Sequence, residues 1–210
     1  MALARTHLIP IQELTPGAVG AIRNQVIADL VRLVSSETSM PEDKLVVRDI
    51  RPFGDLQMYA AGTTAATVDE WLYDATTTVA NAYTTVTGTA TMGDQRYVAL
   101  FGVRDCRREL GLHATTAGAT TARVASVTPY ASVVSFIKIN VGGGDRAIWD
   151  ISGINAYTEA SVAFSPTAVI IPQNSSYNIG YYFVTTVAGL RTYLQLIGVV
   201  VEPRGKLISP

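Results

Sequence analysis

Cys106 and the arginines around it are the residues of this 210-residue chain best suited by type to nucleophilic chemistry. A nearby guanidinium lowers the pKa of a thiol and favours the reactive thiolate, and His113 is a conceivable base for it. A lone cysteine at the end of a predicted strand is, however, more often an inert packing residue. We therefore expect Cys106 to be structural. The adjacent Arg104, Arg107 and Arg108 are expected to form a solvated or interface salt-bridge patch, with contact to phosphate as the alternative.

Two pairs of carboxylates are candidates for acid/base catalysis, namely Asp69 with Glu70 and Asp145 with Asp150. A glycosidase needs two carboxyl groups about 5 to 10 Å apart. Nothing in the spacing of these pairs distinguishes them from turn residues and edge-strand charges. We therefore expect them to be structural and the protein not to be an enzyme.

Metal and nucleotide chemistry find little support in the sequence. The only histidines and cysteine are His7, His113 and Cys106, which are too few for the usual ligand set of zinc or iron. The glycine-rich stretch VGGGDR at 141–146 lacks the Lys-Ser/Thr of a phosphate-binding loop and the following helix of a dinucleotide fold. We expect a flexible turn there and no cofactor.

The composition is that of a folded protein with a weakly charged surface. Charged residues make up 16% of the chain, hydrophobic residues 48%, and the net charge is −1. This balance excludes a disordered chain and leaves no electrostatic footprint for sequence-specific nucleic-acid binding. Since soluble monomers usually carry more surface charge, we expect other subunits to cover much of the surface. We expect neither a secretory signal nor a membrane-spanning helix, because the apolar runs are too short.

One amphipathic helix is predicted near the N-terminus, after an extended arm over residues 1–14. Thr15 suits the N-cap and Pro16 the first helical position, and the helix is expected to end near Ser35 and Ser36. Apolar residues recur through it at three- and four-residue spacing: Val19, Ile22, Val26, Leu30 and Leu33. We expect this stripe to pack on its own domain. Docking on a neighbouring subunit or lying on a membrane surface are the alternatives.

The chain after Pro41 has the pattern of β-strands bounded by turn residues. A final hairpin is predicted within 168–206, in which Tyr177 and Ile179 alternate with polar neighbours. Its second run, Leu194 to Val201, is apolar at nearly every position and predicts a strand covered on both faces. Segment 106–121 is expected to be a short helical turn followed by a surface loop. The other predicted strands are 44–50, 55–61, 70–79, 82–92, 96–105, 121–130, 132–141 and 146–152.

A binding module for carbohydrates or receptors is an alternative function on such a scaffold, with a β-scaffold hydrolase less favoured. Binding modules present aromatic side chains on an exposed face, and the candidates here are Trp71, Tyr73, Trp149 and Tyr157. We expect both tryptophans to be core residues instead.

Two segments carry a resemblance to a known family. Pro172-Gln173-Asn174, Tyr177 to Phe183, Leu190-Arg191 and above all Val-Glu-Pro-Arg-Gly-Lys at 201–206 look like the last strands of single jelly-roll capsid proteins of tailless icosahedral viruses of bacteria and archaea. KLVVRDIRPFGDL at 44–56 is similar to the way those chains enter the roll. The resemblance implies one upright jelly roll in a shell, often over an internal membrane and often beside a second related capsid protein. It implies no catalytic residues.

The sequence therefore predicts an all-β protein, a jelly-roll-like antiparallel β-sandwich over 41–210, preceded over 1–40 by an arm and one amphipathic helix. The expected function is that of a major capsid subunit, made in the host cytoplasm and located in the virion as a homo-oligomer. Lateral contacts would assemble it into an icosahedral shell. The expected subunit interface comprises Val19, Ile22, Val26, Leu30, Arg104, Arg107, Arg108, Arg204 and Lys206.

Overall fold

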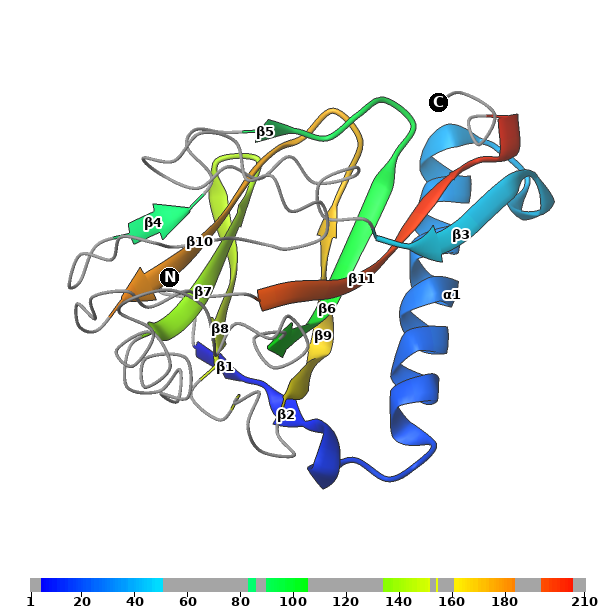
Figure 1. Cartoon of the computed structure of the whole chain (residues 1–210). Helices are drawn as coiled ribbons and strands as arrows, with labels where there is room; N and C mark the ends of the chain where they lie inside the picture. Colours follow the sequence, from blue (N-terminus) through cyan, green and yellow to red (C-terminus); the bar gives the residue numbers. More distant parts are fainter. Residues whose placement is uncertain are drawn as a thin grey trace, which may run out of the picture.

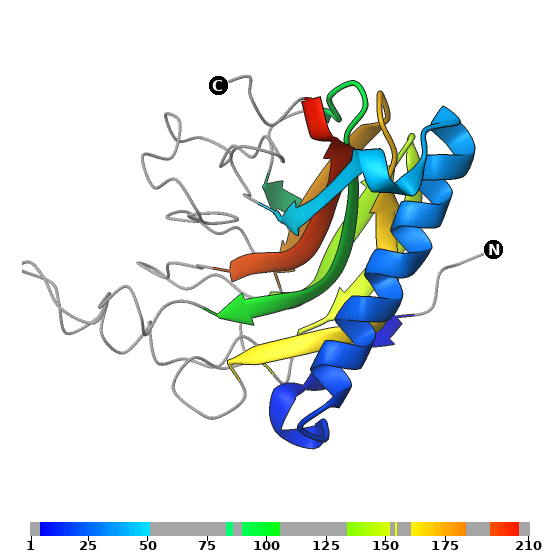
Figure 2. The same cartoon turned by 90° about the vertical axis from the view of Figure 1, so that its right-hand side faces the viewer.

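The structure is a computed structural model and describes residues 5–50, 83–85, 90–105, 134–151, 154, 161–183 and 194–205. Two β-sheets lie face to face, and one long helix, α1 (Ala18–Thr38), covers the outer face of one of them (Figures 1 and 2). The described part is thus a mainly antiparallel β-sandwich with one N-terminal helix, as the sequence predicts. Within that part, no helix combines the length and the apolar composition needed to cross a membrane.

Sheet A has the strand order β1-β8-β7-β10-β4, and β5 also pairs with β10. Sheet B, which carries α1, has the order β2-β9-β6-β11-β3. The strands of sheet A are β1 (Arg5–His7), β4 (Tyr83–Thr85), β5 (Ala90–Thr91), β7 (Val134–Val141), β8 (Gly144–Asp150) and β10 (Ser176–Phe183). Those of sheet B are β2 (Ile9–Pro10), β3 (Leu45–Asp49), β6 (Tyr97–Asp105), β9 (Val162–Ile171) and β11 (Leu194–Pro203). Two short 3-10 helices, η1 (Ile11–Glu13) and η2 (Glu42–Lys44), precede α1 and β3.

One set of antiparallel pairs from β3 onward is nested along the chain, and two further antiparallel pairs, β6 with β11 and β7 with β10, join the nested pairs side by side within each sheet. The first of these strands, β3, pairs with the last, β11, and β4 and β5 pair with β10. Further inward, β6 pairs with β9, and β7 pairs with β8 in a hairpin. Most connections between successive described strands therefore pass from one sheet to the other.

Two apolar cores hold the three layers together. The larger core lies between the sheets and contains side chains such as Val98, Leu100, Ile137 and Trp149, each at most 1% exposed. The second lies between sheet B and α1. Burying apolar area on both faces of sheet B explains why β11 is apolar at nearly every position: Leu196 faces one core and Val199 the other.

The helix begins and ends later than predicted. Its N-cap is Gly17 rather than Thr15, because Ala18 N donates to Thr15 O at 2.9 Å and closes a turn ahead of the first helical residue. At the other end Thr38 is still helical, and its hydroxyl donates to Val34 O at 2.7 Å. The chain leaves the helix at Ser39, whose φ of 55° is left-handed.

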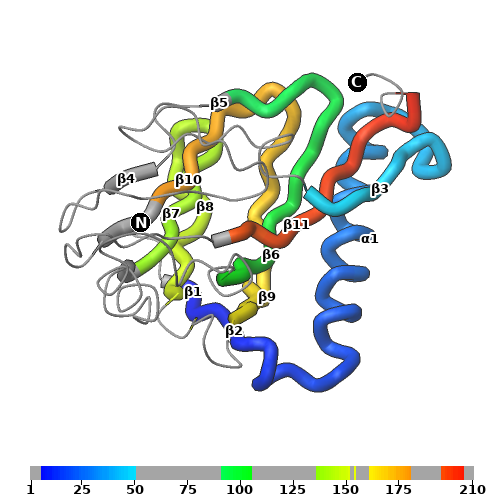
Figure 3. The backbone as a smooth tube through the Cα atoms, viewed as in Figure 1, coloured from blue at the N-terminus to red at the C-terminus, as the bar shows by residue number. Residues whose placement is uncertain are grey.

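The N-terminal arm contacts both sheets. Strand β1 adds in parallel to β8 of sheet A, and β2 adds antiparallel to β9 of sheet B. Figure 3 shows the blue chain passing from β1 to β2 and on toward α1. The arm therefore closes part of one side of the sandwich, and Leu8 between its strands is buried in the core between the sheets.

The predicted final hairpin is wrong. Strand β10 belongs to sheet A and β11 to sheet B, so the two runs face each other across the core instead of pairing. Both are strands with buried apolar faces, which is all that period-two alternation can report. The sequence pattern also missed most of β9, whose Pro166 and Thr167 interrupt the alternation.

Most other strand predictions that fall on described residues are confirmed, with shifted ends. Segment 44–50 contains β3, 96–105 contains β6 and 132–141 contains β7. The turn between β7 and β8 is made by Gly142 and Gly143, whose φ values of 64° and 77° favour glycine. Strand β8 then starts at Gly144, earlier than predicted. Segment 82–92 contains the short β4 and β5, while 55–61, 70–79, 106–121 and 121–130 lie outside the described residues.

Candidate functional site

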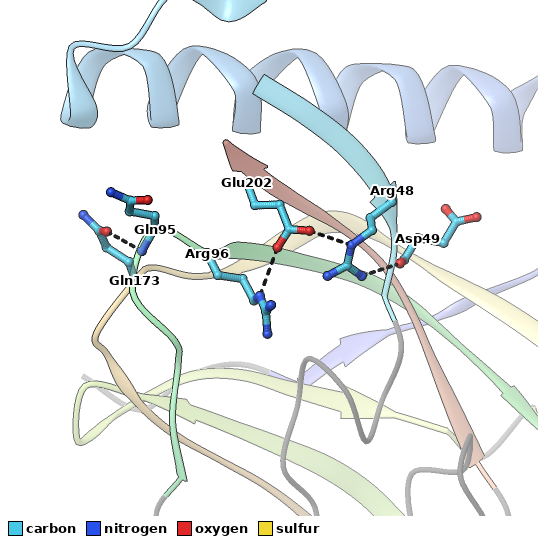
Figure 4. A network of polar contacts seen from close by, with 6 residues as sticks. All are labelled: Arg48, Asp49, Gln95, Arg96, Gln173 and Glu202. Atoms are coloured by element: carbon cyan, nitrogen blue, oxygen red, sulfur yellow. Dashed lines mark hydrogen bonds and ion pairs between the residues drawn. The ribbon is translucent and has the colours of Figure 1, made fainter. Parts of the chain in front are cut away.

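A buried carboxylate lies at the end of β11, where an apolar strand ends in a charged residue. The Glu202 side chain is 3% exposed. Arg48 Nε, on β3, donates to Glu202 Oε1 at 2.9 Å, and Arg96 Nε, just before β6, donates to Oε2 at 3.2 Å (Figure 4). Each carboxylate oxygen thus faces its own guanidinium. We call these three residues the Glu202 cluster.

The electrostatics of the Glu202 cluster keep the carboxylate ionised. Burial by itself would raise the pKa of Glu202, but the hydrogen bonds and charges of Arg48 and Arg96 outweigh it and hold this pKa below its usual value. An ionised carboxylate has no proton to donate, and the two guanidinium partners disfavour its protonation. The cluster therefore acts as a structural clamp joining β3, β6 and β11.

Sequence analysis did not identify this cluster. It did single out the two segments that form most of it, because Arg48 lies in KLVVRDI and Glu202 in Val-Glu-Pro-Arg-Gly-Lys. The structure places these segments side by side, with Arg48 opposite Val200 and Val46 opposite Glu202. A glutamate ending an apolar strand was the available signal, since buried charges are rarely left unpaired.

A second buried polar group lies near the C-terminal end of α1. The Tyr97 side chain is fully buried, and its hydroxyl meets the geometric criteria for a hydrogen bond with none of the described residues. Burial, together with the nearby Glu37 carboxylate, raises the pKa of Tyr97 to about 12. The phenol therefore stays protonated at neutral pH and packs as a core side chain in the α1 layer.

The helical stripe of the predicted interface packs on its own chain, as the favoured interpretation expects. Leu30 is fully buried against sheet B, and Val19, Ile22 and Val26 are partly buried there. Arg204, beyond the end of β11, is exposed, whereas Arg107, Arg108 and Lys206 lie outside the described residues. A subunit contact through these residues stays a prediction.

Two predicted interface residues meet at one pocket. Val19 of α1 and Arg104 of β6 both line a hollow of about 320 Å³ between the N-terminal half of the helix and sheet B. We call it the α1 pocket. The nearly buried rings of Phe101 and Phe164, stacked with centroids 6.3 Å apart, lie at its base, and Ile197 adds apolar surface.

A double irregularity in sheet B shapes the α1 pocket. Phe101 has no partner in either neighbouring strand, because the registers with β11 and with β9 both skip from Leu100 to Gly102. A Cβ at Gly198 would lie 2.4 Å from Ala99 O, so only glycine fits this close approach of β11 to β6. Bulges of this kind redirect side chains, and here the Phe101 ring lies under α1.

One of the two candidate carboxylate pairs, Asp145 with Asp150, lies on described residues. Asp145 and Asp150 lie at opposite ends of β8 rather than across a cleft. Lys138 Nζ lies 2.8 Å from Asp145 Oδ2, and Asn140 Nδ2 donates to Oδ1 at 3.2 Å; these hydrogen bonds lower the pKa of Asp145. His7 Nδ1 lies 3.8 Å from Asp150 Oδ2.

The remaining chemical candidates are mostly outside the described residues, namely Asp69, Glu70, Cys106 and His113. In the described ranges no three His, Cys, Asp or Glu side chains come together as a metal site. Trp149 is 1% exposed in the core between the sheets, so it offers no stacking platform to a glycan. Trp71, Tyr73 and Tyr157 again lie outside the described ranges.

No protein-family model matches the chain, and no curated protein is significantly similar to it. Any proposal for its function therefore rests on the sequence and the structure of the chain itself.

Proposed function

We propose that this protein is a structural subunit of an icosahedral viral shell and that its sandwich is a jelly roll. The nested strand pairing carries the proposal. In a jelly roll a long antiparallel hairpin is rolled up, so that its first and last strands pair, then its second and second-last, and so on inward. The pairings of β3 with β11, β4 and β5 with β10, β6 with β9, and β7 with β8 follow that order.

Topology alone does not select a function, since lectins and cupins use the same architecture. Two further observations favour a shell subunit. The segments that resemble the capsid family, in β3 and β11, are neighbours joined by the Glu202 cluster. Charged residues amount to only 16% of the chain, which suits a surface largely covered by other subunits.

In this proposal the sandwich is a rigid block, and copies of it meet through their lateral faces. The arm that joins both sheets and the helix on sheet B stiffen the block. Closed symmetry repeats each modest contact many times, so no single interface needs to be strong. The partners would be copies of this chain and, as in the family it resembles, a second related capsid protein and an internal membrane.

Assembly of the purified full-length chain tests the proposal. Light scattering and electron microscopy across a range of salt, pH and protein concentration should reveal particles or large closed oligomers. The chain in mild denaturant, where assemblies dissociate, provides the monomer standard. A single monomeric species at high concentration under every condition would contradict the proposal.

A further inference from the structure

The α1 pocket is an apolar hollow with charge at its mouth. Phe101 and Phe164 are 2% and 4% exposed at its base, while the Arg23 side chain is 43% exposed. Its volume of about 320 Å³ is at the lower end of the range for ligand pockets. An occupant that suits it would combine one branched or aromatic apolar group with an acidic group a few ångströms away.

The rim of the pocket carries one accessible guanidinium group, that of Arg23. Arg23 and Arg104 contribute two guanidinium groups, and Asp49 contributes one carboxylate. Arg23 Nη2 lies 3.1 Å from Asp49 Oδ1, but the Asp49 side chain is 76% exposed, and such surface pairs are weak. Arg104 already interacts within its own chain. Arg23 is therefore the rim cation that can turn to an incoming acid at little cost.

The matching group lies in η1, which follows β2 and lies beside β9 near the same end of α1. Ile11 is the large hydrophobic side chain that is exposed within the described part of the chain, at 39%. Glu13, in the same short helix, is also exposed. A protruding aliphatic side chain with a carboxylate two residues further on has the composition that the α1 pocket favours.

We infer that Ile11 of one copy docks in the α1 pocket of the next copy and that Glu13 of the first copy pairs with Arg23 of the second. This inference deepens the proposed function and rests on it. The contact joins two different groups of residues, so it can repeat reciprocally across a two-fold axis or head-to-tail around a ring. Rings of this kind surround the rotation axes of a closed shell.

Site-directed cross-linking tests the contact directly. Two proteins would be prepared in a Cys106→Ala background, one with Ile11→Cys and one with Val19→Cys. Both positions are at least partly exposed, so the new thiols can react. Mixed under mild oxidation, they should form a disulfide between the two different chains, and neither should form it when oxidised alone. Preferential Ile11→Cys self-linkage would mean that η1 meets η1 instead of the α1 pocket and would overturn the inference.

A pair of η1 variants supplies a second measurement. Ile11→Asp should raise the concentration needed for assembly at least about tenfold, because it places a charge in an apolar pocket. Gln12→Asp, which adds the same charge at the exposed neighbouring position, should leave assembly nearly unchanged. Circular dichroism should show that both variants are folded.

The outcomes separate the inference from the proposed function. If the wild type assembles but the mixed chains do not cross-link and Ile11→Asp assembles normally, the contact is wrong while the shell function stands. If the wild type does not assemble and the mixed cysteine variants do not cross-link, both the contact and the shell function are overturned.

Discussion

Replacing Glu202 by Gln should destabilise the protein far more than removing a surface charge. The substituted side chain would keep one acceptor oxygen, but its amide group would point N–H donors at the second guanidinium. Removing one partner of a buried ion pair costs about 3–5 kcal/mol. Arg48 and Arg96 keep 18% and 28% exposure, so water can partly solvate them, and we expect the lower value, about 3 kcal/mol. For a chain of this size that corresponds to a fall in Tm of roughly 6–12 °C.

Thermal and urea unfolding of the wild type and Glu202→Gln measure this cost. Both proteins should be at one low concentration, because assembly would add to the apparent stability. The matched control is Asp145→Asn, which removes a carboxylate whose side chain is 36% exposed beside Lys138 and should cost less than about 1 kcal/mol. A Glu202→Gln variant as stable as this control would refute the idea that the Glu202 cluster is a clamp.

The same variant should change the acid sensitivity of the protein. The pKa of Glu202 is lowered on folding, so the ionised carboxylate contributes stability above its unfolded pKa. That contribution is lost as the pH falls through the folded pKa. The wild type should therefore lose its advantage over Glu202→Gln as the solution is acidified below the ordinary glutamate pKa of about 4.3. A stability difference that did not change with pH would contradict this assignment.

Three other substitutions probe the helix layer and sheet B. Gly198→Ala should destabilise the protein by several kcal/mol, because its Cβ would lie 2.4 Å from Ala99 O. Gly20→Ala on α1 has open space around the added Cβ and should stabilise the protein by about 0.5–1 kcal/mol. Chemical denaturation measures the free energy of unfolding of both variants. Leu30→Ala should cost about 2–5 kcal/mol in the same assay, and a loss below 1 kcal/mol would mean that α1 packs loosely. Tyr97→Phe should be neutral or stabilising at pH 7 because the buried hydroxyl meets the geometric criteria for a hydrogen bond with none of the described residues. The wild type should also lose stability from pH 10 to about pH 12, where only the unfolded tyrosine ionises, and Tyr97→Phe should lose less.

The sequence by itself determined the class of the long helix and of most of the long strands. Apolar residues three and four apart were enough to predict α1, because a helix repeats every 3.6 residues and its stripe must be buried. Period-two alternation and glycines at turns predicted β3, β6, β7 and β11. The unbroken apolar run of β11 correctly indicated a strand covered on both faces, since it lies between two cores.

Only the tertiary structure decided which strands are partners. Alternation reports that a strand has a buried face but not which neighbour supplies its backbone hydrogen bonds, so β10 and β11 were predicted as a hairpin although they lie in opposite sheets. The Glu202 cluster was hidden for the same reason: Arg48 is 154 positions from Glu202 and Arg96 is 106 positions from it. The α1 pocket likewise depends on bulges that appear only once β6 is paired on both sides. The packing of the whole core decides which distant segments pair, and the local pattern of a single strand does not predict its partner.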